Sequence, residues 1–208
     1  MFGDCPTRKR RKEARPAEIV EAARKCFINH GFGATRIDDV AKGAGVSKGT
    51  VYLYFDSKEA LFEAVVRTNV SPVIDSIIQS IEADPETSSI DQLTFVARTM
   101  YREMVGTERR KLMHLVIAEG VRFPHLADFY FKETIAKGQA LMRAVIQRGE
   151  SRGELKANGL DRYPEILMAP TVVAGIFSLV FSAHAPSDLE DYIETHLRVG
   201  LKALEAGS

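Results

Sequence analysis

Apolar residues recur at helical spacing along almost the whole chain, and this periodicity constrains the fold more than any other feature. One example is the stripe of Ile19, Val20 and Phe27, which fits a single face of a helix. No segment shows the strict alternation that is typical of a half-buried strand. Prolines and glycines punctuate the pattern, so Pro16 is expected to open the first helix and Gly31 to end it. We therefore predict an all-α protein of nine helices.

Length and composition are those of a globular protein. The 208 residues are 45% hydrophobic and 27% charged, which excludes a mainly disordered chain. The most apolar stretch, residues 166–185, contains Pro170 and His184, so it is interpreted as a buried helix rather than a membrane span. No apolar segment follows the first charged residues as in a secretory signal. Two cysteines are too few for a disulfide framework, and these features together predict a cytoplasmic protein.

The charge is unevenly distributed although the formal net charge is zero. Residues 1–67 carry 13 Lys and Arg against 9 Asp and Glu, a net charge of +4, and residues 68–208 carry the balancing −4. Five consecutive cations occupy residues 8–12. A basic N-terminal third favours contact with a polyanion such as nucleic acid, although such a run can also be a solvated tail. Residues 1–14 are expected to form a disordered basic arm.

Residues 37–55 have the pattern of two short helices joined by a glycine-containing turn. Small residues, Ala41, Ala44 and Gly45, occupy the corner where two steeply crossing helices must approach closely. Val51 can pack inward from the second helix. The rest of that helix then presents a short polar surface with a cation near its leading end. A major groove of DNA admits one such helix, whose first residues meet the base edges.

Three runs in this region closely resemble the DNA-binding domain of TetR-family transcriptional regulators. They are residues 31–41 (GFGATRIDDVA), 45–55 (GVSKGTVYLYF) and 57–61 (SKEAL), and the resemblance covers about residues 15–65. It implies a TetR-like fold in which three N-terminal helices bind DNA. It further implies that the C-terminal helices form a ligand pocket and that the last two make the interface of a homodimer. Most members of the family are repressors.

The resemblance also assigns roles to single residues. Tyr54 and Lys58 match positions that contact phosphates. A phosphate partner would explain a cation in the first turn of a helix, where the helix dipole favours anions. The predicted DNA-binding residues are Thr35, Arg36, Ser47, Lys48, Gly49, Thr50, Tyr52, Tyr54 and Lys58. The expected partner is double-stranded DNA that carries a palindromic operator.

The chain is therefore expected to divide into a basic arm (residues 1–14), a helix-turn-helix domain (15–60) and a ligand-binding and dimerisation domain (61–208). Residues 118–130 have a weaker similarity to multidrug-type regulators of the family. Phenylalanine, tyrosine and methionine are frequent in this part and favour a small apolar or aromatic effector. The candidate ligand-binding residues are Phe95, Tyr101, His114, Phe123, Phe129, Met168, Phe177 and Phe181.

The last helix carries an aliphatic stripe at helical spacing. The stripe consists of Leu189, Ile193, Leu197, Leu201 and Leu204. A monomer would bury some of it against its own helices. The resemblance implies that the partner subunit covers a share, so these residues are the predicted dimer interface.

Other classes of protein find less support. The sequence has no glycine-rich phosphate loop, nucleophile elbow or paired metal-ligand motif, so an enzyme built on a helical bundle is disfavoured and neither a cofactor nor a metal is expected. His114 and Glu119 are five residues apart and do not share a helical face well. A DNA-binding architectural protein without an effector is a second alternative, and a fully packed C-terminal core would favour it.

Overall fold

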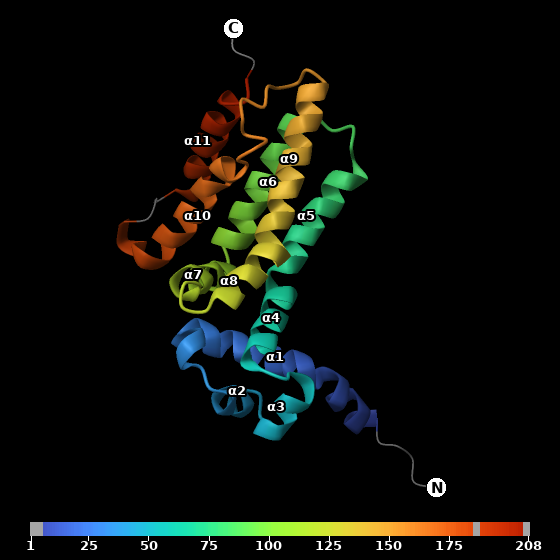
Figure 1. Ribbon diagram of the computed structural model, residues 1–208, viewed down its shortest axis with the longest axis vertical. Coiled ribbons are helices and arrows are strands. Elements are labelled where there is room, and N and C mark those ends of the chain that lie inside the picture. The colour runs from blue at the N-terminus through green and yellow to red at the C-terminus, as the bar shows by residue number, and fades with distance from the viewer. Residues whose placement is uncertain (1–5, 185–187, 206–208) are drawn as a thin grey trace. The chain divides into compact units, whose positions relative to one another are not determined.

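The computed structural model describes the backbone of residues 6–184 and 188–205 and the side chains from residue 15 onward. Within these residues every regular element is a helix, which confirms the all-α prediction (Figure 1). The α-helices are α1 (Pro6–Ala34), α2 (Ile37–Gly43), α3 (Lys48–Tyr54), α4 (Lys58–Asn69), α5 (Ser71–Ala83), α6 (Ser89–Met100), α7 (Arg109–Glu119), α8 (Pro124–Tyr130), α9 (Ala136–Ser151), α10 (Glu165–Val180) and α11 (Leu189–Lys202).

Three short segments of other helix types supplement them. They are the π-helical η1 (Tyr101–Val105) and η2 (Phe131–Ile135) and the 3-10 helix η3 (Ser182–His184). η1 continues α6, and η2 joins α8 to α9 without a break. Only Val70 separates α4 from α5. We count α4 and α5 as one interrupted helix and count each π segment together with the α-helices that adjoin it. On this count the α-helical elements of the described residues are the nine predicted helices.

The chain divides into two compact units, each formed by two segments. The first unit contains residues 1–69 and 115–130, and the second contains residues 70–114 and 131–208. The boundary expected at residue 60 therefore differs from the observed one. The reason is that α4 packs on α1, where the ring centroids of Phe27 and Phe62 are 5.9 Å apart. α8 in turn packs on α4, where the Arg67 guanidinium lies 4.8 Å from the centre of the Phe129 ring.

α1 is longer than the sequence predicted. It begins at Pro6 and includes Pro16 and the basic run at residues 8–12. The structure gives a helical backbone to residues 6–14, where the sequence predicted a disordered arm, and residues 1–5 lie outside the described part. Arg, Lys, Glu and Ala are strong helix formers, so they can extend a helix beyond an internal proline. At the other end Gly31 has φ 79° and ψ 166°, so the helix breaks at the predicted glycine.

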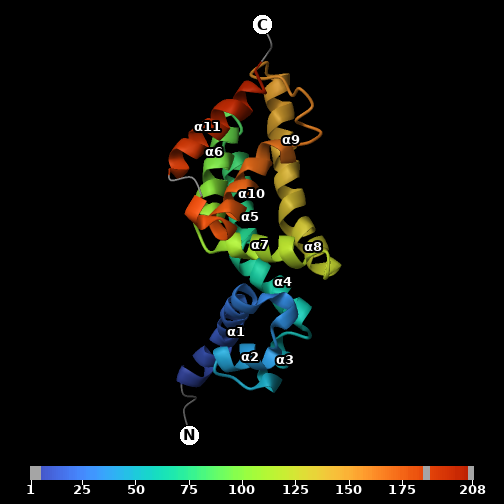
Figure 2. The same ribbon diagram turned by 90° about the vertical axis from the view of Figure 1, so that its left-hand side faces the viewer.

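The second unit is a bundle in which α5, α6 and α9 lie side by side, with α10 and α11 next to α6 (Figures 1 and 2). Ile77 of α5, Leu93 of α6 and Ile146 of α9 belong to its buried core. Pro72 occupies the first turn of α5, where its missing N–H leaves no intrahelical hydrogen bond unmade. None of the helices described here is both long and apolar enough to cross a membrane.

Candidate nucleic-acid interface and candidate ligand cavity

α2 and α3 form a helix-turn-helix around a tight turn. The N–H of Ala44 donates to the Val40 carbonyl at 2.9 Å, and the N–H of Val46 donates to the Ala41 carbonyl at 3.0 Å. Gly45, between them, has a φ of +64°, a left-handed conformation that favours glycine. Val40 is fully buried, as is Val51 of α3, so apolar burial fixes both helices in the first unit.

The first turn of α3 is fixed by hydrogen bonds from residues that were predicted to contact DNA. The Ser47 hydroxyl caps the helix by accepting the N–H of Thr50 at 3.1 Å. The two hydroxyls of Ser47 and Thr50 are 2.9 Å apart. Lys48 Nζ donates to Asp38 Oδ2 at 2.9 Å in an exposed ion pair that links α3 to α2. These contacts orient the leading end of α3 and leave Ser47 and Lys48 open to solvent.

The outward face of α3 combines polar groups with one large apolar side chain. Val51 is the buried residue of α3, whereas Lys48 and Gly49 are exposed and Tyr52 is 46% exposed. Leu53 is 73% exposed and is not among the DNA-binding residues predicted from the sequence. Gly49 and Leu53 are four residues apart and share a helix face, which is the signal that could have identified Leu53. Such a side chain can contact the thymine methyl group in a major groove.

Thr35 and Arg36, just before α2, differ in their surroundings. Thr35 is only 2% exposed, and its hydroxyl donates to the Gly31 carbonyl at 2.6 Å. Its predicted DNA contact is corrected to a bond that holds the chain between α1 and α2. Arg36 is exposed at the N-cap of α2, and Tyr54 at the end of α3 is half-buried.

Lys58, in the first turn of α4, binds the segment that follows the break in α1. Its ammonium group donates to the carbonyls of Phe32 at 2.8 Å, Gly33 at 3.3 Å and Thr35 at 3.1 Å. It also lies 4.5 Å from the centre of the Phe32 ring. An ammonium group has three donors, and each has a carbonyl partner here. The structure thus gives Lys58 a role inside the first unit, where the sequence predicted a phosphate contact.

Glu119, at the end of α7, binds the N–H groups of the same segment. One carboxylate oxygen accepts from the Phe32 N–H and the other from the Gly33 N–H, each at 2.8 Å. A Cβ on Gly31 would lie 2.3 Å from Glu119 Oε1, so a larger residue would push the carboxylate away from these N–H groups, and the φ of +79° also favours glycine. Glu119 is not among the site residues predicted from the sequence. The signal for it is that the chain leaves helical geometry at Gly31, so the N–H groups of the next residues need an acceptor from elsewhere.

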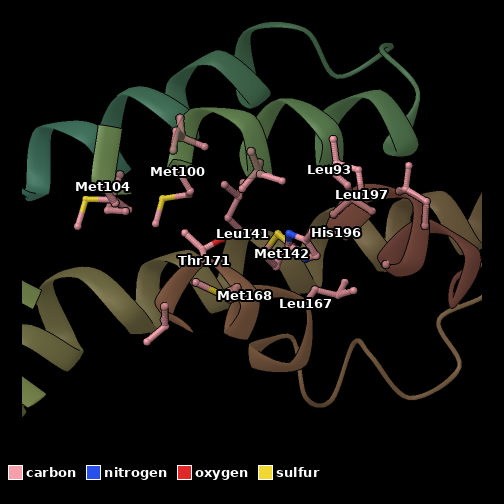
Figure 3. Close-up of a pocket in the computed structure, with 18 of the residues that line it drawn as sticks. Leu93, Met100, Met104, Leu141, Met142, Leu167, Met168, Thr171, His196 and Leu197 are labelled. Atoms are coloured by element: carbon pink, nitrogen blue, oxygen red, sulfur yellow. The ribbon is translucent and has the colours of Figure 1, made fainter. Parts of the chain in front are cut away.

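The second unit contains an apolar cavity lined by residues from α5, α6, η1, α7, α9, α10 and α11 (Figure 3). The cavity volume that the centre of a water-sized sphere can occupy is about 100 Å³. Every methionine of the chain except Met1 lines it: Met100, Met104, Met113, Met142 and Met168. Among the described residues that line the cavity, Thr171 and His196 are the only ones with polar side chains.

His196 reaches the cavity from α11 and is held by Tyr101 of η1. His196 Nδ1 and the Tyr101 hydroxyl oxygen are 2.9 Å apart. Burial raises the pKa of Tyr101 to about 12 and lowers the pKa of His196 below its usual value. Both groups are therefore uncharged near neutral pH, so no lining residue in the described part of the chain brings a charge to the cavity.

One predicted ligand-binding residue, Met168, lines the cavity, and Tyr101 lies behind it in contact with His196. His114 is half-buried and is not among the lining residues. Three others are exposed on outward helix faces or helix ends: Phe95, Phe177 and Phe181.

The remaining two predicted ligand-binding residues belong to the first unit. The ring of Phe123 packs on Phe32 with centroids 5.0 Å apart, and Phe129 lies against Arg67. These side chains complete the core around α1 and α4. Helical spacing identified aromatic faces in the sequence, but it could not show which unit each face would join.

The predicted dimer stripe on α11 faces its own unit. Ile193, Leu197 and Leu204 are buried, and Leu197, Leu201 and Leu204 line the cavity. Leu189 packs on the buried cluster around Tyr101 and Ile193. The stripe is needed to close the monomer's own core, which corrects its assignment to the interface.

Apolar side chains are exposed on other faces of the last two long helices. They are Ile166, Val173, Phe177 and Val180 of α10 and Val199 of α11. Successive residues of the α10 set are seven, four and three positions apart in the sequence, so all four share one helix face. A contiguous exposed apolar face of this kind is typical of an interaction surface.

A helix-turn-helix with an exposed, partly basic helix, in a chain whose second unit holds an apolar cavity, defines a DNA-binding regulator of the helix-turn-helix class. Residues 19–65 match the family "Bacterial regulatory proteins, tetR family", and residues 84–189 match "Tetracyclin repressor-like, C-terminal domain". The chain therefore belongs to the TetR family of transcriptional regulators, as the sequence resemblance implied, and this is a family of regulators rather than enzymes.

Individual relatives agree with this assignment. The regulator UidR of Escherichia coli K12 is 27% identical over 201 residues, which are 94% of this chain and 94% of UidR. An uncharacterized regulator of Bacillus subtilis, YfiR, is 38% identical over 90 residues, so that the match spans 41% of this chain and 44% of YfiR. The structure of Bacillus subtilis FadR in complex with stearoyl-CoA has a TM-score of 0.71 at 17% identity, over 91% of this chain and 99% of FadR. That likeness shows the common fold.

Proposed function

We propose that the protein is a homodimeric repressor that releases a palindromic operator when a small apolar molecule enters the cavity of the second unit. The cavity carries this proposal, because an architectural DNA-binding protein without an effector has no need of unfilled apolar space. A repressor acts where the chromosome is, which places the protein in the cytoplasm. The structure of FadR with stearoyl-CoA supports an effector with an apolar part, since FadR has the same fold.

In this proposal α3 is the recognition helix. Lys48, Gly49, Tyr52 and Leu53 are exposed on it and meet base edges in the major groove. Arg36, Tyr54 and the basic run at residues 8–12 contact phosphates, which would fix the position of the protein on DNA without reading its sequence.

The dimer forms through the exposed apolar face of α10 and the neighbouring Val199 of α11. Burial of large side chains such as Val173 and Phe177 supplies the favourable free energy. A two-fold axis through this face makes the two α3 helices symmetric, which is why the operator is expected to be palindromic. The half-sites would be about 34–36 Å apart, or one helical turn of DNA.

α7 offers the route from effector to DNA, because its residues belong to both units. Met113 lines the cavity, and Glu119 holds the segment that leads into α2. A ligand that displaces Met113 would shift α7 and change the restraint on that segment. The ligand must bind the DNA-bound state and the released state of the protein with different affinities. A coupling of about 1–3 kcal/mol would lower DNA affinity ~5–150-fold.

The experiment begins with selection of bound duplexes from a random-sequence library by the full chain. An inverted repeat among the selected sequences supports the proposal, and selected sequences without symmetry contradict it. Lys48→Ala and Leu53→Ala should each weaken binding to the selected duplex by about tenfold relative to random DNA. Lys202→Ala, which removes an exposed cation from α11 in the second unit, is the matched control and should leave binding unchanged.

A further inference from the structure

We infer that the cavity of the second unit binds an uncharged, flexible aliphatic molecule with a hydroxyl group that donates to Thr171. This inference deepens the proposed function, and its regulatory consequence rests on that function. Binding itself can be measured without DNA, so the two can fail separately.

The side chains that line the cavity exclude a charged ligand. Among its described lining residues there is no Asp, Glu, Lys or Arg, and His196 is neutral near pH 7. A carboxylate or ammonium group that entered the cavity would lose its hydration without gaining a counter-ion. The ligand, or the part of it inside the cavity, must therefore be uncharged.

The same lining disfavours a rigid aromatic ligand. No phenylalanine or tyrosine among the described residues lines the cavity, so a flat ring finds no partner for stacking and gains only contacts with methionine sulfur, often at its edge. Five methionines line it instead. Methionine side chains are unbranched and polarizable and adapt to ligands of irregular or changing shape. A flexible aliphatic chain fits such a surface best.

The hydroxyl of Thr171 favours a ligand that is more than a plain hydrocarbon. Figure 3 shows Thr171 and His196 near the middle of the cavity, with Met100 and Met104 toward one end and Leu197 toward the other. His196 is already bonded within the protein, through Nδ1 to Tyr101 and also to the backbone of Leu167. The Thr171 hydroxyl interacts with the Tyr101 hydroxyl, and its oxygen can accept a further hydrogen bond. An alcohol group on the ligand can donate to that oxygen without carrying a charge.

Methionine methyl groups make the test direct. The full chain is labelled with ¹³C at the methionine methyl positions and titrated with four probes: 1-octanol, octanoate, octyltrimethylammonium and 2-naphthalenemethanol. Octanol should shift the five cavity signals and leave Met1 unchanged as an internal control. Its affinity should exceed that of each other probe by about tenfold or more.

Thr171→Val tests the hydrogen-bonding group, because valine has nearly the shape of threonine. The substitution should weaken the binding of octanol by about five- to tenfold and leave the binding of hexane unchanged. Thr195→Val, at an exposed position of α11, is the matched control. If Thr171→Val loses affinity for octanol and for hexane equally, the assigned role of Thr171 is overturned, since the change would then be a general change in packing.

The outcomes separate the inference from the proposed function. Tighter binding of octanoate, octyltrimethylammonium or 2-naphthalenemethanol overturns the ligand class and leaves an effector-controlled repressor possible. Failure of octanol to shift the five cavity signals overturns the inference outright. If octanol binds as expected but does not release the selected operator duplex, the ligand class stands and the effector role in the proposed function fails.

Discussion

Glu119 and Phe32 are 87 residues apart in the sequence, yet Glu119 Oε1 accepts the Phe32 N–H at 2.8 Å. The other carboxylate oxygen accepts the Gly33 N–H, and Lys58 binds three carbonyls of the same segment. The Glu119 carboxylate therefore binds the N–H groups of this short irregular stretch, and the Lys58 ammonium group binds its carbonyls. Because this stretch leads directly into α2, its position sets where the helix-turn-helix begins.

Glu119→Ala should destabilise the first unit. The substitution leaves two part-buried N–H groups without acceptors, and each such loss costs about 1–3 kcal/mol. Urea denaturation followed by circular dichroism measures the change. Glu119→Gln keeps one amide oxygen as an acceptor and should lose about half as much. Glu205→Ala, at an exposed position, is the control. Equal stability of Glu119→Ala and the native chain would show that the two hydrogen bonds contribute nothing.

Lys58→Met should lower stability and weaken binding to all DNA sequences without changing the salt dependence. All three donors of the Lys58 ammonium have carbonyl partners, so no phosphate contact is expected to be lost. A phosphate contact would instead contribute about 0.9 to the slope of log K against log salt. Fluorescence anisotropy at several salt concentrations distinguishes the two roles. A slope reduced by that amount would restore the phosphate contact predicted from the sequence.

The sequence predicted best those features that depend on local backbone chemistry. Gly31 ends the regular helix because its left-handed φ is accessible to glycine, and Gly45 shapes the turn for the same reason. Val40 and Val51 are buried as their spacing required. Each of these is settled by a residue type and its immediate neighbours, without knowledge of distant contacts.

The errors occurred where a long-range contact decided the outcome. Leu197 lies on a clear apolar stripe, but spacing alone cannot show whether that stripe meets its own core or a second subunit. Phe123 is a predicted pocket residue, yet it packs on Phe32, 91 positions earlier in the sequence. Lys58 and Thr35 are polar residues whose partners are backbone groups, and such partners leave no side-chain pattern in a sequence.

Val173→Arg should convert a dimer into monomers while preserving the fold. Val173 is 45% exposed on α10, so an arginine there is solvated in the monomer and would be buried without a partner in the proposed interface. Sedimentation velocity measures the molecular mass. Leu197→Arg is the contrasting variant, because Leu197 is only 8% exposed and its replacement should lower the melting temperature instead. A tight dimer of folded Val173→Arg would place the interface elsewhere.

His196 should make the stability of the second unit depend on pH below about 6.5. Burial lowers the pKa of His196 in the folded state below the ordinary value of 6.5, so between these two values the unfolded chain binds more protons. The free energy of unfolding should therefore fall as the pH is lowered from 6.5 toward the folded pKa, and the contribution of His196 should be constant above 6.5.

Urea denaturation between pH 5 and 8 measures this dependence. His196→Phe should remove part of the slope even if it lowers stability at every pH, because the Tyr101 hydroxyl loses one of its two side-chain partners. His184→Gln, at an exposed position, should keep the slope of the native chain. Identical slopes for His196→Phe and the native chain would mean that His196 does not titrate differently in the folded and unfolded states.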